Sequence, residues 1–232
     1  MSEARAEVLQ RIRGALGHGA AVPEVPRDYL GAGDPAPSGG DVVELFCERC
    51  ADYRATVRRV SEQELPAAVA AACAERGVRR LVTPPGGPTA LEGIELVADD
   101  PPLGARELDG FDGVLTGCAL AIAETGTIVL DSGARSGRRA ITLVPDYHAC
   151  VVEAGHIVPG IPDAVALLAE AAADGRPVTL VSGPSATSDI ELDRVEGVHG
   201  PRTLDVFVVV IGREARVEPG WTDRGRAGTM TA

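Results

Sequence analysis

Residues 206–211 read VFVVVI, and every side chain in this run is β-branched or aromatic. A strand with apolar side chains on both faces is typical of the interior of a parallel sheet that is covered on both sides. The run therefore predicts a buried interior strand over 205–211. Other strand-like runs precede it in the chain, at 56–60, 80–83, 94–97, 127–130, 141–144, 149–153 and 178–182.

Helical patterns alternate with these strands. Apolar side chains at helical spacing predict a helix over 42–50. A second predicted helix begins at an S-x-x-E capping box, residues 61–64, and ends at Gly77. A third is predicted over 163–173. The alternation of strand and helix predicts an α/β domain over 41–211.

The two ends of the chain differ from this domain. Residues 2–17 carry a narrow apolar stripe at helical spacing, which predicts a helical arm. Residues 19–40 are rich in glycine and proline without periodicity, so residues 1–40 are expected to form a helix and a linker. Residues 212–232 lose hydrophobic periodicity, which predicts a C-terminal tail.

The composition argues against several functions. The 232 residues carry a formal charge of −12, which opposes binding to nucleic acid. No apolar run approaches the ~20 residues of a membrane span, and the N-terminus lacks the apolar core of a secretion signal. We therefore expect a cytoplasmic protein without a membrane span. All 22 basic residues are arginine, which excludes lysine Schiff bases and a P-loop lysine.

Five cysteines stand in scattered apolar segments, an odd number that favours reduced, buried thiols over a disulfide framework. Cys47 and Cys50 have C-x-x-C spacing, but no second pair follows at zinc-site spacing. His148 and Cys150 form an H-x-C pair without a third ligand at a suitable spacing. We therefore expect neither a metal site nor an intrinsic cofactor.

A lone acidic residue marks the first candidate site. The segment 121–130, AIAETGTIVL, places Glu124 among small residues just before a strand. A partly desolvated carboxylate there can act as a nucleophile or a base, and Gly126 lets the backbone approach a ligand closely. The alternative is structural, with the carboxylate bracing neighbouring backbone amides. The residues favour neither interpretation over the other.

A second candidate segment, residues 180–191, reads LVSGPSATSDIE. An apolar strand ends here in a Gly-Pro turn, followed by several hydroxyl side chains and Asp189. In open α/β sheets ligands bind beyond the carboxyl ends of the strands, where small residues expose amides and hydroxyls to anions. The pattern suits a subsite for a carboxylate or a phosphate, although an ordinary turn with capping hydroxyls is the commoner origin of such a segment.

Two further segments carry side chains suited to the same site. His199 lies in the glycine-flanked segment GVHGP, residues 197–201, where an imidazole suits proton transfer near neutral pH. Arg139 ends GARSGRR, residues 133–139, whose three arginines can clamp a carboxylate through the guanidinium fork. The alternatives are a histidine that braces its turn and a solvated loop.

Taken in order, AIAETGTIVLDSG, ITLVPDYH, LVSGPSATSDIE and GVHGP before a terminal apolar strand resemble the lactate-utilization protein C family, also called the LUD domain. The resemblance covers about residues 41–211. It implies a NagB/RpiA/CoA-transferase-like α/β fold, with a sheet covered by helices. It also implies a role beside two iron-sulfur partner proteins that oxidise L-lactate to pyruvate in the bacterial cytoplasm.

The resemblance also marks individual positions in three of these segments. They are Glu124, Thr125, Gly126 and Thr127; Ser182, Gly183, Ser185, Thr187, Asp189 and Glu191; and His199, Gly200 and Pro201. The candidate catalytic residues are Glu124 and His199. The candidate ligand-binding residues are Thr125, Gly126, Thr127, Arg139, Ser182, Gly183, Ser185, Thr187, Asp189 and Gly200.

Three functions follow as alternatives. In the first, the chain is an accessory subunit of a lactate-oxidising system that binds a small carboxylate or stabilises the complex, with iron-sulfur clusters carried by partner proteins. In the second, the E-T-G turn, which is similar to the glutamate turn of CoA transferases, makes Glu124 a nucleophile toward a CoA ester. In the third, the chain is a scaffold without catalysis.

Overall fold

The computed structural model describes residues 3–17, 24–34, 40–188, 194–197 and 199–210. The chain divides into two units, Met1–Leu30 and Gly31–Ala232. In the first unit, helix α1 (Glu3–Leu16) forms over most of the predicted helix, and none of its residues is buried. The predicted tail, 212–232, lies outside the described residues.

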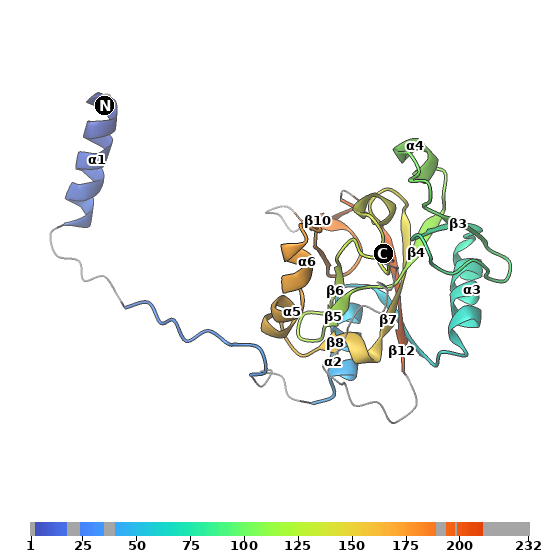
Figure 1. Cartoon of the computed structure of the whole chain (residues 1–232). Coiled ribbons are helices and arrows are strands. Elements are labelled where there is room, and N and C mark those ends of the chain that lie inside the picture. Colours follow the sequence, from blue (N-terminus) through green and yellow to red (C-terminus); the bar gives the residue numbers. More distant parts are fainter. Residues whose placement is uncertain (1–2, 18–23, 35–39, 189–193, 198, 211–232) are drawn as a thin grey trace, which may run out of the picture. The chain divides into compact units, whose positions relative to one another are not determined.

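A six-stranded parallel sheet forms the centre of the second unit (Figure 1). Its strands, in spatial order, are β1 (Thr56–Val60), β12 (Thr203–Val209), β7 (Tyr147–Glu153), β4 (Gly113–Thr116), β2 (Arg80–Thr83) and β3 (Glu95–Ala98). β12 pairs with β1 on one side and with β7 on the other, and all its residues after Thr203 are buried. The interior strand predicted over 205–211 is confirmed for 205–209, whereas Val210 follows the strand and is exposed, and Ile211 lies outside the described residues.

A second, mixed sheet has four strands. In spatial order they are β8 (Ile157–Val158), β5 (Leu120–Ile122), β6 (Thr127–Leu130) and β9 (Thr179–Val181). β5 and β6 form an antiparallel hairpin, and β9 is antiparallel to β6. A separate two-stranded ladder joins β10 (Ala186–Ser188) to β11 (Arg194–Glu196).

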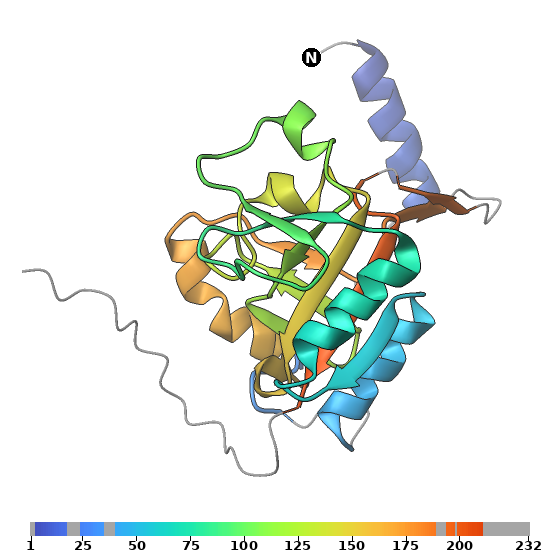
Figure 2. The ribbon, with the colours of Figure 1, turned by 90° about the vertical axis from the view of Figure 1, so that its right-hand side faces the viewer.

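Helices cover both faces of the six-stranded sheet. α3 (Leu65–Arg76) lies over one face, as Figure 2 shows from the side of that helix. α2 (Val42–Asp52) and the second sheet lie on the other face, with α5 (Ile161–Leu167) and α6 (Ala169–Ala173) packed beyond that sheet. The remaining helices are short: α4 (Ala105–Leu108), η1 (Arg139–Thr142) and η2 (Ala154–His156). The predicted α/β class, a sheet covered by helices, is confirmed.

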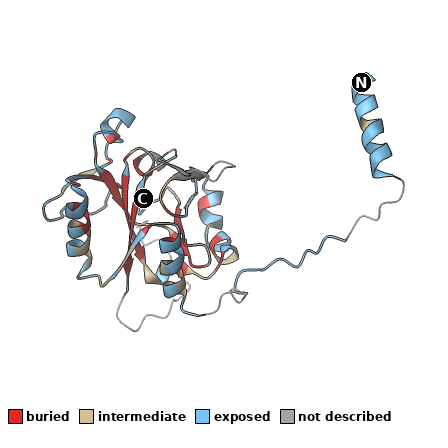
Figure 3. Ribbon diagram, turned by 180° about the vertical axis from the view of Figure 1, so that it is seen from behind, coloured by how far each residue is buried: buried red, intermediate tan, exposed pale blue. Residues whose placement is uncertain are grey.

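Alternate side chains of β12 enter two separate hydrophobic cores. Val206 packs in one core with Phe46 of α2 and Ile128 of β6. Phe207 points the other way and packs with Val69 of α3. Figure 3 shows the burial that results along the central strands. Burying a side chain of this size contributes about 1.5–3 kcal/mol, so β12 fastens both layers to the sheet.

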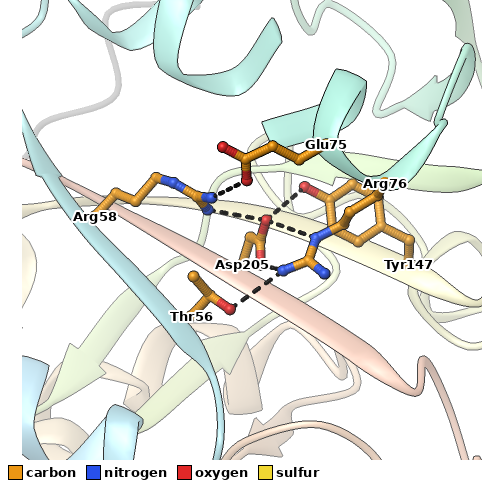
Figure 4. A network of polar contacts seen from close by, with 6 residues as sticks. All are labelled: Thr56, Arg58, Glu75, Arg76, Tyr147 and Asp205. Carbon is orange, nitrogen blue, oxygen red and sulfur yellow. Dashed lines mark hydrogen bonds and ion pairs between the residues drawn. The ribbon is translucent and has the colours of Figure 1, made fainter. Parts of the chain in front are cut away.

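One residue of β12 interrupts the apolar pattern. Asp205 is fully buried on the α3 side of the sheet (Figure 4). Its carboxylate accepts hydrogen bonds from Arg76 Nη2 at 2.6 Å and Nε at 3.1 Å, from Arg58 Nη1 at 3.1 Å and from the Tyr147 hydroxyl at 3.1 Å. Burial and the nearby Asp205 charge raise the pKa of Tyr147, so its hydroxyl stays protonated and donates. These bonds compensate the buried charge and join α3 to three strands.

The local signals for the second predicted helix are confirmed. Glu64 Oε2 accepts from the Ser61 backbone N–H at 2.9 Å, and Ser61 Oγ accepts from the Glu64 N–H at 3.3 Å. α3 then ends at Gly77. The helix predicted over 163–173 forms as two short helices, α5 and α6, which meet at Leu168.

The strand predicted over 141–144 is wrong, because residues 139–142 form the 3-10 turn η1. Ile141 is completely buried in a cluster with Val82 and Val114, so a turn rather than a strand supplies this part of the core. The Thr142 hydroxyl donates to the Arg139 carbonyl at 3.2 Å and so stabilises the turn. An apolar run of four residues does not distinguish these two outcomes.

Candidate functional site

Three loops enclose a cavity of 290 Å³ at the amino ends of β7 and β12. η1 contributes one wall, the segment from β9 to Ser185 a second, and the segment before β12 a third. The residues that line it are Arg139, Thr142, His148, Thr179, Leu180, Val181, Ser182, Gly183, Pro184, Ser185, His199, Gly200, Pro201 and Leu204. The cavity thus brings together six of the candidate residues: Arg139, Ser182, Gly183, Ser185, His199 and Gly200.

The position of this cavity differs from the expected one. The serine-rich loop was expected beyond the carboxyl ends of parallel strands. However, β9, which leads into that loop, belongs to the mixed sheet and runs antiparallel to β6. The cavity instead lies at the amino ends of two parallel strands, so the carboxyl-edge rule does not apply to it. The strand pattern alone did not reveal which sheet β9 joins.

The structure separates the three arginines of the loop before η1. Arg135 pairs with Glu153 and donates to His156 Nδ1 at 2.9 Å. Arg138 Nη2 donates to the buried Asp99 Oδ1 at 2.8 Å. These two guanidinium groups therefore serve the fold.

Arg139 is different. Its side chain is half-buried in the cavity wall, and its Nη1 donates to Thr142 Oγ1 at 3.2 Å. Among the described residues no carboxylate pairs with it. Burial lowers the pKa of Arg139, although a guanidinium remains charged at neutral pH. A cation that is partly desolvated and lacks a counter-charge in this part of the chain is suited to bind an anion.

Ser185 ties two walls of the cavity together. Its N–H donates to the Pro201 carbonyl at 2.8 Å, its carbonyl accepts from the Gly197 N–H at 2.9 Å, and its hydroxyl oxygen accepts from the His199 N–H at 3.0 Å. His199 is exposed at the rim. The Ser185 side chain therefore positions the histidine loop as well as lining the cavity.

Glu124 lies in a different place. The E-T-G turn joins β5 to β6, and Glu124 lines a separate surface hollow with Arg49, Asp52, Tyr53 and Thr125. The structure thus puts the two candidate catalytic residues, Glu124 and His199, in different depressions. A chain of hydroxyls connects the two regions.

That chain consists of three side chains. Thr127 Oγ1 lies 2.7 Å from Thr125 Oγ1 and 2.7 Å from Ser182 Oγ. Thr125 faces the hollow of Glu124, whereas Ser182 lines the Arg139 cavity. Thr127 is thus a buried link between the two and does not line either depression.

Two candidate glycines pack against the end of α2. Gly126 has φ +58°, and a Cβ there would lie 2.7 Å from the Arg49 carbonyl carbon and the Cys50 nitrogen. Gly183 has φ +78°, and a Cβ there would lie 2.6 Å from the Tyr53 carbonyl oxygen. Only glycine fits such close backbone contacts at positive φ. Both glycines therefore allow close packing against α2, and Gly183 also lines the Arg139 cavity.

The remaining candidates are described only in part. Thr187 lies in β10, and Asp189 and Glu191 lie outside the described residues. The five cysteines are free, and all of them except Cys47 are buried. The described segments contain no group of three potential metal ligands. Within those segments, no helix is long and apolar enough to cross a bilayer.

Sequence reasoning did not include the buried histidine of the cavity among the candidate site residues. His148 is only 2% exposed, lines the cavity, and has its Nε2 at 2.8 Å from Thr116 Oγ1. Burial, together with the nearby Arg139 charge, lowers the pKa of His148 to about 4, so the ring is neutral at pH 7. In the sequence, His148 is a histidine inside an apolar strand. Such a residue is equally expected to be a hydrogen-bonded core residue.

Comparison with known proteins finds relatives of this chain. A family model described as the LUD domain matches residues 104–210, which include the E-T-G hairpin, η1 and the cavity loops. A lactate utilization protein C of Deinococcus radiodurans is 46% identical over 211 residues, or 90% of this chain and 96% of that protein. An Escherichia coli protein, YkgG, described as uncharacterized, is 31% identical over 158 residues, or 61% of this chain and 67% of that protein.

A solved structure agrees with these matches. The crystal structure of a DUF162 family protein from Deinococcus radiodurans aligns with a TM-score of 0.61 and 42% identity, covering 72% of this chain and 96% of that chain. An α/β fold with these loops in the matched region is that of a LUD-domain protein. The chain belongs to the lactate utilization protein C family.

Proposed function

We propose that this protein is a cytoplasmic accessory subunit of a bacterial lactate-utilization system, and that it binds a small carboxylate in the Arg139 cavity. Iron-sulfur partner proteins would carry the electrons released when L-lactate is oxidised to pyruvate. Support for the lactate role comes from the name of the Deinococcus relative, which aligns with nearly the whole chain. The ligand is proposed from the chemistry of the cavity.

One observation carries the ligand assignment: Arg139 has no carboxylate partner among the described residues, while Arg135 and Arg138 of the same loop each have one. A guanidinium in a half-buried position favours a planar, bidentate anion, and a carboxylate has that geometry. The hydroxyls of Thr142 and Ser182 line the same cavity and can bond further oxygens of the ligand. A three-carbon acid is small enough for 290 Å³.

The assignment of iron-sulfur clusters to partners follows from the cysteines. Cluster ligation uses several thiolates at close spacing. Only Cys47 and Cys50 lie close together in the chain, whereas the other three cysteines stand at 73, 118 and 150. The electron-transfer groups therefore belong, in this proposal, to other proteins.

The ligand part is tested by calorimetric titration of the full chain with L-lactate, pyruvate and propionate. Arg139→Gln should weaken binding of all three acids by about tenfold to a hundredfold, because a hydrogen bond to a charged group contributes about 1.5–3 kcal/mol. Arg106→Gln, a change at an exposed arginine of α4, is the matched control and should bind as the wild type does. Equal affinities of Arg139→Gln and wild type would contradict the proposal.

The partner part is tested in lactate-grown cells of the source organism. The tagged protein should copurify with proteins that contain iron and acid-labile sulfide, as measured by mass spectrometry and by iron assay. Two results together would contradict the subunit role. The tagged protein would purify from lysates of lactate-grown cells without a partner, and a strain that lacks the gene would grow normally on lactate.

A further inference from the structure

The buried histidine of the cavity has one ring nitrogen available for a ligand. His148 Nε2 bonds Thr116 Oγ1 at 2.8 Å. Within the described part of the chain, every side-chain nitrogen or oxygen sealed from solvent has a hydrogen-bond partner. Nδ1 has no partner there, so it faces the open space of the cavity that His148 lines.

The hydrogen-bond chain behind His148 favours one tautomer of the ring. Thr116 Oγ1 donates to Cys150 Sγ at 3.9 Å, and Cys150 Sγ donates to the Gly117 carbonyl at 3.8 Å. The carbonyl can only accept, so the donors of the chain all point toward it. With all three contacts as hydrogen bonds in this order, Thr116 accepts from the Nε2–H of His148. In this arrangement the neutral ring has its proton on Nε2, and Nδ1 carries a lone pair.

The cavity therefore presents a hydrogen-bond acceptor beside a cation. Arg139 lies close enough to His148 for its charge to act on the ring. A ligand that satisfies both groups has a carboxylate for Arg139 and a hydrogen-bond donor nearby for Nδ1. A 2-hydroxy acid has these two groups on adjacent carbons. A 2-oxo acid instead presents a carbonyl oxygen, which would face the Nδ1 lone pair without a proton between them.

We propose that His148 is the specificity-determining residue of the cavity: its Nδ1 accepts a hydrogen bond from the 2-hydroxyl of a 2-hydroxy acid whose carboxylate is bound by Arg139. This inference rests on the proposed carboxylate site and adds the class of acid that the site selects. The His148 side chain contacts the ligand, and Thr116 is a positioning residue that fixes the tautomer of the His148 ring.

The ligand test compares three acids of similar size. Wild type should bind L-lactate at least about tenfold more tightly than pyruvate or propionate, since pyruvate presents an acceptor and propionate lacks the hydroxyl. Thr116→Val keeps the side-chain shape but frees the tautomer, so this preference should fall toward unity while propionate affinity stays unchanged. Thr83→Val, at a buried threonine of β2 outside the cavity, is the control and should keep the preference.

A second measurement does not depend on any variant. Nitrogen-15 NMR of the histidine-labelled wild type should show one ring that remains neutral across pH 5–8, with its proton on Nε2 and a lone pair on Nδ1. His148→Phe identifies that signal by its loss and, if it folds, should bind the three acids alike.

The outcomes separate the two proposals. Arg139-dependent binding with no preference for L-lactate, or an NMR signal with the proton on Nδ1, overturns the role of His148 and leaves the carboxylate site standing. If none of the acids binds in an Arg139-dependent way, the carboxylate site itself is wrong, and the role of His148 falls with it. Preference for L-lactate that is lost in Thr116→Val supports both.

Discussion

Replacing Asp205 by Asn tests whether the buried carboxylate of β12 holds α3 to the sheet. The substitution keeps the volume of the side chain, so it adds no cavity, but it removes the charge that accepts four hydrogen bonds from Arg58, Arg76 and Tyr147. Removing one member of a buried ion pair costs about 3–5 kcal/mol. The two arginine side chains are 25% and 30% exposed, so water can solvate them in part, and we expect a loss of about 3 kcal/mol.

The assay is urea unfolding followed by far-UV circular dichroism at pH 7, with the slope of the transition checked for equality between proteins. Glu75→Gln is the matched control, because Glu75 pairs with the same Arg58 but is 62% exposed. Exposed pairs contribute about 0–1 kcal/mol, so this control should unfold near the wild-type midpoint. If Asp205→Asn loses less than about 1 kcal/mol, or if Glu75→Gln loses as much, the network does not stabilise the fold as argued here.

Three further predictions concern the cavity and its supports. The pKa of His148 is about 4 in the folded protein, below the unfolded value near 6.5, so the unfolded chain gains this proton first as the pH falls. The contribution of His148 to stability should therefore be full above pH 6.5 and fall by about 3 kcal/mol toward pH 4. In urea unfolding at a series of pH values, His148→Gln should reduce this pH dependence. Gly126→Ala should lower the midpoint of thermal unfolding by several degrees, corresponding to at least about 1–3 kcal/mol, whereas Gly155→Ala, at a glycine with open space around it, should change it little. Arg138→Gln should lower the free energy of unfolding by about 2–3 kcal/mol, because it leaves the buried carboxylate of Asp99 without its ion-pair partner. Arg139→Gln should keep a free energy of unfolding within about 1 kcal/mol of wild type in the same urea assay. Equal stabilities within either pair would contradict the roles assigned to these residues.

The fold was more predictable than the site, for a physical reason. Residues 206–209 are apolar on both faces because β12 is buried between two layers, so the local sequence carries the information. The run at 141–144 has the same apolar character, but its partners in the core come from β2 and β4, and only tertiary packing makes it a turn.

The site was harder to predict because it is formed by contacts between residues that are distant in the sequence. Sequence proposed Arg139 together with two neighbouring arginines, but the partner of Arg138 lies 39 residues away and that of Arg135 lies 18 away, so the loop itself could not reveal which cation remains for a ligand. His148 was considered only as part of an H-x-C pair. Its neighbour Thr116 comes from β4, a strand that the pattern did not indicate.

The place of β12 in the sheet has a consequence for synthesis of the chain. β1 pairs in the six-stranded sheet with β12 alone, and the contact between Arg58 and Asp205 joins residues 147 positions apart. As the protein leaves the ribosome, β1 and β7 therefore wait with unpaired edges until residues 203–209 emerge. Exposed edges of this kind attract other strands, so a nascent chain halted before residue 203 is expected to aggregate or to occupy a chaperone. A single late segment thus decides whether β1 joins the other four strands in one sheet.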